Sequence, residues 1–282
     1  MPSFTDTSLL PVHNGAGLKK GSLSQLSNYL GTKFSNPNLL TNPDFKINQR
    51  GATNYESDSG ASVNTYSVDR WSLYRHKLAV NSDKSITLTN TPSSEGAFSQ
   101  ILEDAVEGDV TIQIYVVDVS GSASVLVMTS DGRTVVDVGN LKKGLNVFHY
   151  NNGLKKIYIK VLNGTITLKY AKVEQGTVAT PFIAPNRADE LVKCCRFFQT
   201  FQVLYSTYGV ASQHYYQKLP LVTPFRSNPT VSITEQYMYN VSSKSIEWKT
   251  DGGMGWLNLD LVATNNSQTV CQMVCVSDAE IY

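Results

Sequence analysis

The stretch Val110-Thr111-Ile112-Gln113-Ile114-Tyr115-Val116 decides the fold class, because apolar residues alternate in it with other residues at a period of two. Alternation at this period places one face of a β-strand in a core and turns the other face outward. Residues 157–161, Ile-Tyr-Ile-Lys-Val, have the same pattern. The pattern recurs from residue 36 to about residue 185 and predicts a region of half-buried strands.

Turn signals separate these runs. Asn163-Gly164 lies between the alternating runs 157–162 and 165–170, and we expect a type I′ hairpin there because both residues tolerate positive φ. Asn152-Gly153 and Asp131-Gly132 indicate further reversals. Short strands at this spacing predict a β-sandwich or jelly roll over residues 36–185, since two one-sided sheets cover each other's apolar faces.

A helical pattern follows the strands and links them to a second β region. Asn186 is the expected N-cap of a helix over 186–202, and Asp189 and Glu190 complement the helix dipole in the first turn. The residues at helical spacing are Ala188, Leu191, Val192, Cys195 and Phe198. Strands are expected after the helix at 230–234, 245–249, 256–261 and 269–276. We therefore expect a smaller antiparallel β domain at 203–282 and a mostly all-β chain.

Residues 1–35 form a leader unlike the rest of the chain. It opens with an extended stretch, and Ser22 is then the expected cap of one short amphipathic helix that Gly31 ends. The apolar residues of that helix are Leu23, Leu26, Tyr29 and Leu30. Because a helix this short is marginal alone, we expect it to pack on another subunit or another protein, or to fold back on its own domain.

Composition excludes several classes of partner. The chain of 282 residues has 24 Lys and Arg against 23 Asp and Glu, and charged residues are only 17%. No broad basic face is therefore expected, and nucleic acid is not an expected partner. The first residues do not resemble a signal peptide, and no run of about 18 apolar residues would span a membrane. A soluble protein without membrane insertion is expected.

The sequence shows no pattern of catalytic or metal-binding residues. The four histidines are far apart, and the cysteines, Cys194-Cys195 with Cys271 and Cys275, fit neither a disulfide framework nor a zinc site. We expect buried free thiols, no metal, no cofactor and no enzyme activity. A glycosidase pair stays open, because such carboxylates are set by distance in space and not by spacing in sequence.

Several motifs resemble, in the same order, those of a group of tail-fibre and structural proteins of tailed bacteriophages. The first is Asn38-Leu39-Leu40-Thr41-Asn42-Pro43-Asp44-Phe45-Lys46-Ile47-Asn48-Gln49-Arg50-Gly51. Those that follow are Val68-Asp69-Arg70-Trp71, Val173-Glu174-Gln175-Gly176, Ala179-Thr180-Pro181-Phe182, Glu190-Leu191, Cys195-Arg196-Phe197-Phe198-Gln199, Leu219-Pro220, Phe225-Arg226, Asn228-Pro229-Thr230-Val231 and Asp278-Ala279-Glu280-Ile281. Phe197-Phe198 stands where the family more often has tyrosines, and Phe225 where it often has Met.

The resemblance covers about residues 38–282 and implies a jelly roll like a carbohydrate-binding module, a small β domain after it, and a homotrimer on the virion surface. It implies a fibre, spike or other appendage of the tail or capsid that contacts other virion proteins through residues 1–35 and presents its β domains to host-surface polysaccharide. One alternative is a purely structural capsid, collar or baseplate protein. Another is a glycan-degrading spike.

The motif residues are expected to be architectural. Trp71 is expected between sheets, Asp69 and Arg70 are expected to pair, and Gly51 and Gly176 are expected in turns. Sugar contact is expected instead on tyrosines in loop-like sequence after the linking helix, where pyranose faces can stack on rings. These candidates are Tyr205, Tyr208, Tyr215 and Tyr216.

Overall fold

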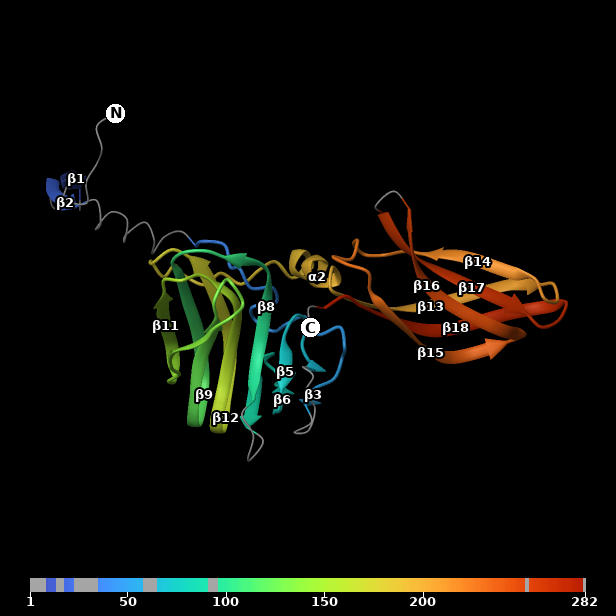
Figure 1. Cartoon of the computed structure of the whole chain (residues 1–282), viewed down its shortest axis with the longest axis horizontal. Helices are drawn as coiled ribbons and strands as arrows, with labels where there is room; N and C mark the ends of the chain where they lie inside the picture. Colours follow the sequence, from blue (N-terminus) through green and yellow to red (C-terminus); the bar gives the residue numbers. More distant parts are fainter. Residues whose placement is uncertain are drawn as a thin grey trace.

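The protein has two β domains, with one described helix between them. The computed structural model describes residues 9–13, 18–22, 35–57, 65–90, 96–251 and 254–280. In Figure 1 the small domain extends away from the larger one, and helix α2 (Arg187–Cys195) lies between them. The last strand of the small domain runs back toward this helix. The expected attachment helix, with Leu23, Leu26, Tyr29 and Leu30, lies outside the described residues.

Near the N-terminus, β1 (Leu9–His13) and β2 (Leu18–Ser22) pair with each other as an antiparallel hairpin. The larger domain contains β3 (Asn54–Glu56), β4 (Thr65–Tyr66), β5 (Ser72–Tyr74), β6 (His76–Val80), β7 (Ile86–Asn90), β8 (Ala97–Val106), β9 (Val110–Met128), β10 (Val135–Asn140), β11 (Gly144–Tyr150) and β12 (Leu154–Gln175). In the described part of the chain these strands form one continuous hydrogen-bonded sheet.

The two long strands β9 and β12 fold this sheet into a sandwich. Residues 122–128 of β9 and 154–161 of β12 belong to a layer with the order β10, β9, β12, β8, β5, β4. Residues 110–119 and 165–175 of the same strands belong to the opposite layer, with the order β11, β9, β12, β7, β6, β3. Strands that pass from one layer to the other make the corner of a sandwich.

The expected hairpin at Asn163-Gly164 is wrong, because both residues lie at this corner within β12. Gly164 pairs with Gly121 of β9, their φ values are 75° and 93°, and the register shifts between Val161 and Asn163. A Cβ atom on Gly164 would lie 1.9 Å from the carbonyl oxygen of Ser120. The expected positive φ is confirmed at Gly164 and not at Asn163. At Gly164 it belongs to a bulge that bends two paired strands and not to a chain reversal.

The core between the layers consists of the expected alternating residues. Val110, Ile112 and Ile114 are fully buried in one layer, and Ile157 and Ile159 in the other. Trp71 is also fully buried, as expected, with its ring stacked on Phe98 at a centroid distance of 4.6 Å. Turns at Gly51, Gly132, Gly153 and Gly176 all have positive φ, which confirms the expected turn positions.

Helix α2 is shorter than its pattern predicted. Asn186 caps it, and its side chain accepts hydrogen bonds from the backbone N–H groups of Ala188 and Asp189. The helix ends at Cys195, and the aromatic and β-branched run that follows is strand β13 (Phe198–Gly209), so the expected continuation to residue 202 is wrong. Leu191 and Val192 are exposed on the helix, whereas Glu190, Cys194 and Cys195 are buried.

The small domain is a sandwich of two sheets, with the orders β13-β18-β15 and β14-β17-β16 in the described chain. The other strands are β14 (His214–Leu219), β15 (Thr230–Tyr239), β16 (Val241–Asp251), β17 (Met254–Ala263) and β18 (Ser267–Asp278). Each strand predicted by alternation in this region is present and is longer than expected. Leu257, Leu259 and Leu261 of one sheet pack against Cys271 and Met273 of the other.

Candidate functional site

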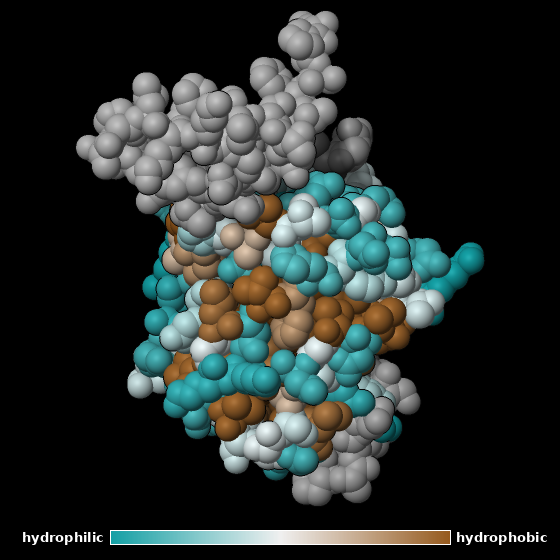
Figure 2. Space-filling model, turned by 90° about the vertical axis from the view of Figure 1, so that its left-hand side faces the viewer, coloured by the Kyte–Doolittle hydropathy of each residue, from teal (hydrophilic) through white to brown (hydrophobic). Residues whose placement is uncertain are grey.

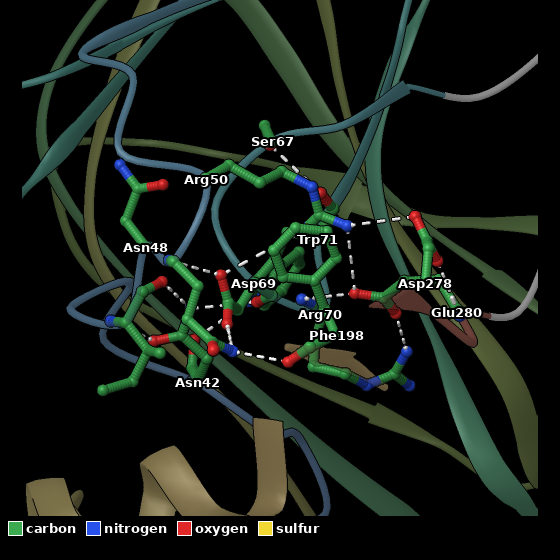
Figure 3. Close-up of polar contacts among 12 residues, drawn as sticks. Asn42, Asn48, Arg50, Ser67, Asp69, Arg70, Trp71, Phe198, Asp278 and Glu280 are labelled. Atoms are coloured by element: carbon green, nitrogen blue, oxygen red, sulfur yellow. Dashed lines mark hydrogen bonds and ion pairs between the residues drawn. The ribbon is translucent and has the colours of Figure 1, made fainter. Parts of the chain in front are cut away.

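The motif residues from distant parts of the chain meet at the junction of the two domains (Figure 3). Arg70 Nη1 lies 2.7 Å from Glu280 Oε2, and both side chains are almost completely buried. Arg50 Nη2 lies 3.6 Å from Asp278 and 3.7 Å from Glu280, and the Arg50 guanidinium lies 3.8 Å from the centre of the Phe198 ring. The junction therefore joins the first, second and last motifs of the chain.

The expected pair between Asp69 and Arg70 is wrong, because each has a partner elsewhere. Asp69 accepts hydrogen bonds from the backbone N–H and the side-chain amide of Gln49, at 2.8 and 2.6 Å. The same amide of Gln49 donates to the carbonyl oxygen of Phe198 at 2.7 Å. Arg70 has φ of 71° in a tight turn and bonds to Glu280 instead. Asp69 and Arg70 therefore have the expected architectural role, but each bonds to a residue of another motif and not to the other.

Burial dominates the electrostatics of this junction. It raises the pKa of Asp69, although the two hydrogen bonds from Gln49 lower it in part. Burial likewise raises the pKa of Glu280 against the opposing effect of the Arg70 and Arg50 guanidinium groups. The charged groups face one another across the junction, although Nη1 and Nη2 of Arg50 and Nε of Arg70 are buried without a hydrogen-bond partner among the described residues. The cluster therefore joins the two domains through ion pairs that are only partly satisfied by hydrogen bonds.

The four cysteines are buried free thiols, as expected. Burial raises the pKa of Cys195 and of Cys271 to about 11 and raises those of Cys194 and Cys275 as well. A thiol in such an environment is a poor nucleophile. Among the described residues, no group of three or more His, Cys, Asp or Glu is placed to hold a metal ion. No helix in the described part of the chain is long and apolar enough to cross a bilayer.

The four candidate tyrosines do not form one surface, because they lie on strands and not in a loop. Tyr205 and Tyr215 point into the core between the two sheets, with ring centroids 6.5 Å apart. Tyr208 is exposed on the outer side of β13, and Tyr216 is exposed on the outer side of β14. Since β13 and β14 belong to opposite sheets, these two rings face opposite directions. Only Tyr208 and Tyr216 remain available to a ligand.

The outer side of the β14-β17-β16 sheet, which we call the polar face, combines rings with hydrogen-bonding groups. Strand register and alternation give its members as His214, Tyr216, Lys218, Ser245, Glu247, Lys249, Trp256, Asn258 and Asp260. Tyr216 is 64% exposed, and it lies opposite Asp260 in the register. Its ring stacks beside His214 at 5.9 Å, and Nδ1 of His214 lies 3.0 Å from an Asp260 carboxylate oxygen.

A second ring lies further along the polar face. Trp256 is partly exposed, and the ammonium group of Lys218 lies 4.2 Å from its ring centre. Trp256 and Asp260 are four residues apart on β17, a distance of about 13 Å at ~3.3 Å per residue. Asn258 lies between them, opposite Lys218 of β14 and Glu247 of β16 in the register. An extended ligand with both apolar and hydroxyl surfaces would fit this arrangement.

Sequence reasoning missed most of the polar face. The strand predicted at 256–261 contained a usable signal, because alternation puts Trp256, Asn258 and Asp260 on one side. It did not show that β14 would pair with this strand, which brings Tyr216 and Lys218 beside them. Pairing between strands about 45 residues apart has no local signal in the sequence.

The larger domain offers less to a ligand. Tyr170 is stacked between Phe182 at 4.0 Å and Tyr115 at 5.5 Å, so the faces of its ring are occupied. Figure 2 shows the side of the sandwich that carries β11, where hydrophobic residues are interspersed with hydrophilic ones. Leu145 and Val147 of β11 are exposed. Scattered apolar side chains of this kind are normal on a protein surface.

Two cavities lie in or beside the larger domain. One of about 310 Å³ is lined by Lys172 and Glu190, among others, but Lys172 is bonded to Thr180 and Glu190 to Lys193. Another of about 230 Å³ is lined by Arg70 and Glu103, which bind Glu280 and Arg196. The charged groups named here are already paired within the protein.

Neither a family model nor a curated protein matches the chain. Solved structures of family 29 carbohydrate-binding modules resemble it. A module from Piromyces equi is 14% identical, with 44% of this chain and 93% of that chain covered and a TM-score of 0.30. A mutant of another family 29 module is 15% identical, with 48% and 100% covered and a TM-score of 0.31.

Proposed function

We propose that this chain is an appendage protein of a tailed-bacteriophage virion and that it binds host-surface glycan through the polar face. The observation that carries the glycan proposal is the exposed ring of Tyr216 beside the carboxylate of Asp260, with the amide of Asn258 and the ring of Trp256 along the same strand. Sugar rings stack on aromatic faces, and their hydroxyl groups bond to carboxylates and amides.

The phage assignment comes from the ordered motifs, and the junction supports it. Gln49, Asp69, Arg70, Phe198 and Glu280 belong to four separate motifs, yet they form one connected and buried set of contacts. A shared junction is a physical reason for the motifs to occur together. In the proposed assembly, residues 1–35 attach the chain to other virion proteins and three copies present their small domains to the host. Deletion of residues 1–35 should therefore reduce incorporation into particles.

Titration with soluble, monovalent oligosaccharides from host polysaccharide tests the glycan proposal. We expect a single-site Kd near 1 mM, about −4 kcal/mol, and a loss of about tenfold in affinity for Tyr216→Ala. Tyr208→Ala is the matched control, because it removes an equally exposed tyrosine from the opposite side of the domain. A monovalent ligand keeps the measurement independent of how many copies assemble.

The variants Tyr205→Ala and Tyr215→Ala do not serve this purpose, because these rings pack in the core and their loss would destabilise the domain. A folded Tyr216→Ala protein that binds like the parent would remove the polar face from the proposal. If no host glycan binds the parent protein, a purely structural appendage is the better description. Release of reducing ends from the polysaccharide would instead indicate a degrading spike.

A further inference from the structure

The opposite side of the small domain has a different composition. The outer side of the β13-β18-β15 sheet, which we call the neutral face, has no charged side chain at its alternating positions from the register row of Gln202 to the row of Tyr208. The charged residue of β15 within these rows, Glu235, is exposed at a bulge and pairs with Lys244 of β16 in the opposite sheet. Its members are Gln202, Leu204, Ser206, Tyr208, Thr234, Tyr237, Tyr239, Gln268, Val270, Gln272 and Val274. Its members on β13 and β15 are exposed and those on the central strand β18 from Val270 to Val274 are half-buried, so the outer surface of this sheet carries no charge in a chain of which 17% of residues are charged.

The neutral face is also apolar over much of its area. Leu204 is 69% exposed, and Tyr237 lies in the same register row, across Gln272. In the next row, Tyr239 lies across Val270 from Ser206. If complete burial of an aromatic side chain covers about 200 Å², the three tyrosines alone expose on the order of 350 Å². Together with Leu204, the valines and the glutamines, the face approaches the ~800 Å² per partner of a standard protein interface.

We infer that copies of this chain pack on one another through the neutral face. An exposed apolar patch of this size marks an interaction surface on a folded protein. The absence of charge favours a second copy of the chain as the partner, because two neutral faces meet without leaving any charge buried and unpaired. When each copy uses the same surface around a symmetry axis, the oligomer is closed, and no copy has an unused contact surface that could add further chains.

This arrangement leaves the polar face outward in every copy, because the two faces lie on opposite sheets of one sandwich. Assembly through the neutral face is independent of what the polar face binds. It would multiply whatever affinity that face has by presenting several copies together.

Light scattering of the full-length chain after size-exclusion chromatography tests the inference. We expect the parent protein to have the mass of two or three chains at micromolar concentration. Leu204→Glu should shift the mass to that of one chain, with the midpoint of association raised at least tenfold in concentration. Tyr237→Lys, in the same register row, should act in the same way. Both positions are exposed, so circular dichroism and thermal unfolding should show a folded protein.

The control is Leu145→Glu, which places the same charge at an exposed leucine of the larger domain. It should leave the oligomer mass unchanged. A parent protein that is monomeric at tens of micromolar would overturn the inference, and so would Leu204→Glu and Tyr237→Lys variants that keep the parent mass. A monomeric parent that loses oligosaccharide affinity on Leu204→Glu would assign the neutral face to sugar instead.

Discussion

The two outer faces of the small domain differ although they are built in the same way. Each belongs to a three-stranded antiparallel sheet that gives every second residue to a shared core. The neutral face presents Leu204, Val270 and three tyrosines, whereas the polar face presents His214, Lys218, Glu247, Lys249 and Asp260 around two rings. Because packing in the core constrains only every second residue of each strand, the residues between them can differ between the two outer surfaces. The difference is the basis of the two proposals, that the neutral face mediates self-association and that the polar face binds glycan.

The largest expected effect is at the junction, which lies outside both faces. Replacement of Arg70 by Ala removes the nearer of the two cations beside the buried carboxylate of Glu280 and leaves only Arg50, at 3.7 Å. Loss of one member of a buried ion pair costs about 3–5 kcal/mol. Thermal or denaturant unfolding measures this loss. Arg133→Ala, at an exposed arginine of the larger domain, should change stability by less than about 0.5 kcal/mol.

The Arg70→Ala variant also tests whether self-association and sugar binding depend on the small domain alone. At 25 °C, where the Arg70→Ala protein should still be folded, its oligomer mass and its oligosaccharide affinity should match those of the parent. A folded variant that has lost either self-association or sugar binding would show that contacts at the junction also determine the properties of the small domain's faces.

The next largest effect concerns the core that both faces share. Leu259 is fully buried between the sheets, and Leu259→Ala should cost about 2–5 kcal/mol of unfolding free energy. Since the core positions strands of both sheets, self-association and sugar binding should weaken at the same temperature during heating. Leu145→Ala, at an exposed leucine, is the control. Loss of one property well below the temperature of the other would show that the two sheets open independently.

The sequence predicted strands more reliably than their connections. Alternation at 110–116 and 157–161 identified the buried apolar positions correctly, because period and burial have the same physical cause. The expectation that the other side of 110–116 turns outward is wrong for Thr111 and Gln113, which are buried and hydrogen-bonded to the segment 174–180. Asn163-Gly164 was misread as a hairpin because a bulge at a sheet corner and a tight turn require the same positive φ. The run from Phe197 to Phe201 fits both a helix and a strand, and only pairing with β18 decided between them.

The candidate site was predicted in part. The aromatic stretch 205–216 contains one ring of the polar face, Tyr216, but strand alternation sends Tyr205 and Tyr215 into the core and Tyr208 to the opposite sheet. The turn between β13 and β14 passes the chain from one sheet to the other. No local feature of the sequence shows which sheet a strand joins, so the division into two faces became visible only in the structure.

The third prediction tests whether the core between the faces stays closed. Cys271 and Cys275 lie on β18 with their side chains buried in the small domain. Since burial raises the pKa of Cys271 to about 11, about 0.1% of this thiol is ionised at pH 8, compared with roughly a quarter of an ordinary thiol. Labelling by a thiol reagent at pH 8 should be at least ~100-fold slower than in denaturant. The rate should rise about tenfold per pH unit up to pH 10. Rapid labelling of the native protein at pH 8 would show that the two sheets separate readily.

The smallest expected effect is that of salt on sugar binding at the polar face. The basic side chains on this face have partners within it: Lys249 lies beside Glu247, His214 beside Asp260, and Lys218 over the ring of Trp256. The whole chain has a formal charge of only +1. A neutral sugar is therefore not drawn by a long-range field that added ions could screen. The single-site Kd should change by less than about twofold between 50 and 500 mM NaCl.

An affinity that falls tenfold over this range, and that Lys218→Ala abolishes, would indicate an anionic glycan held by the lysines of the polar face. Stacking on Tyr216 would then be a secondary contribution.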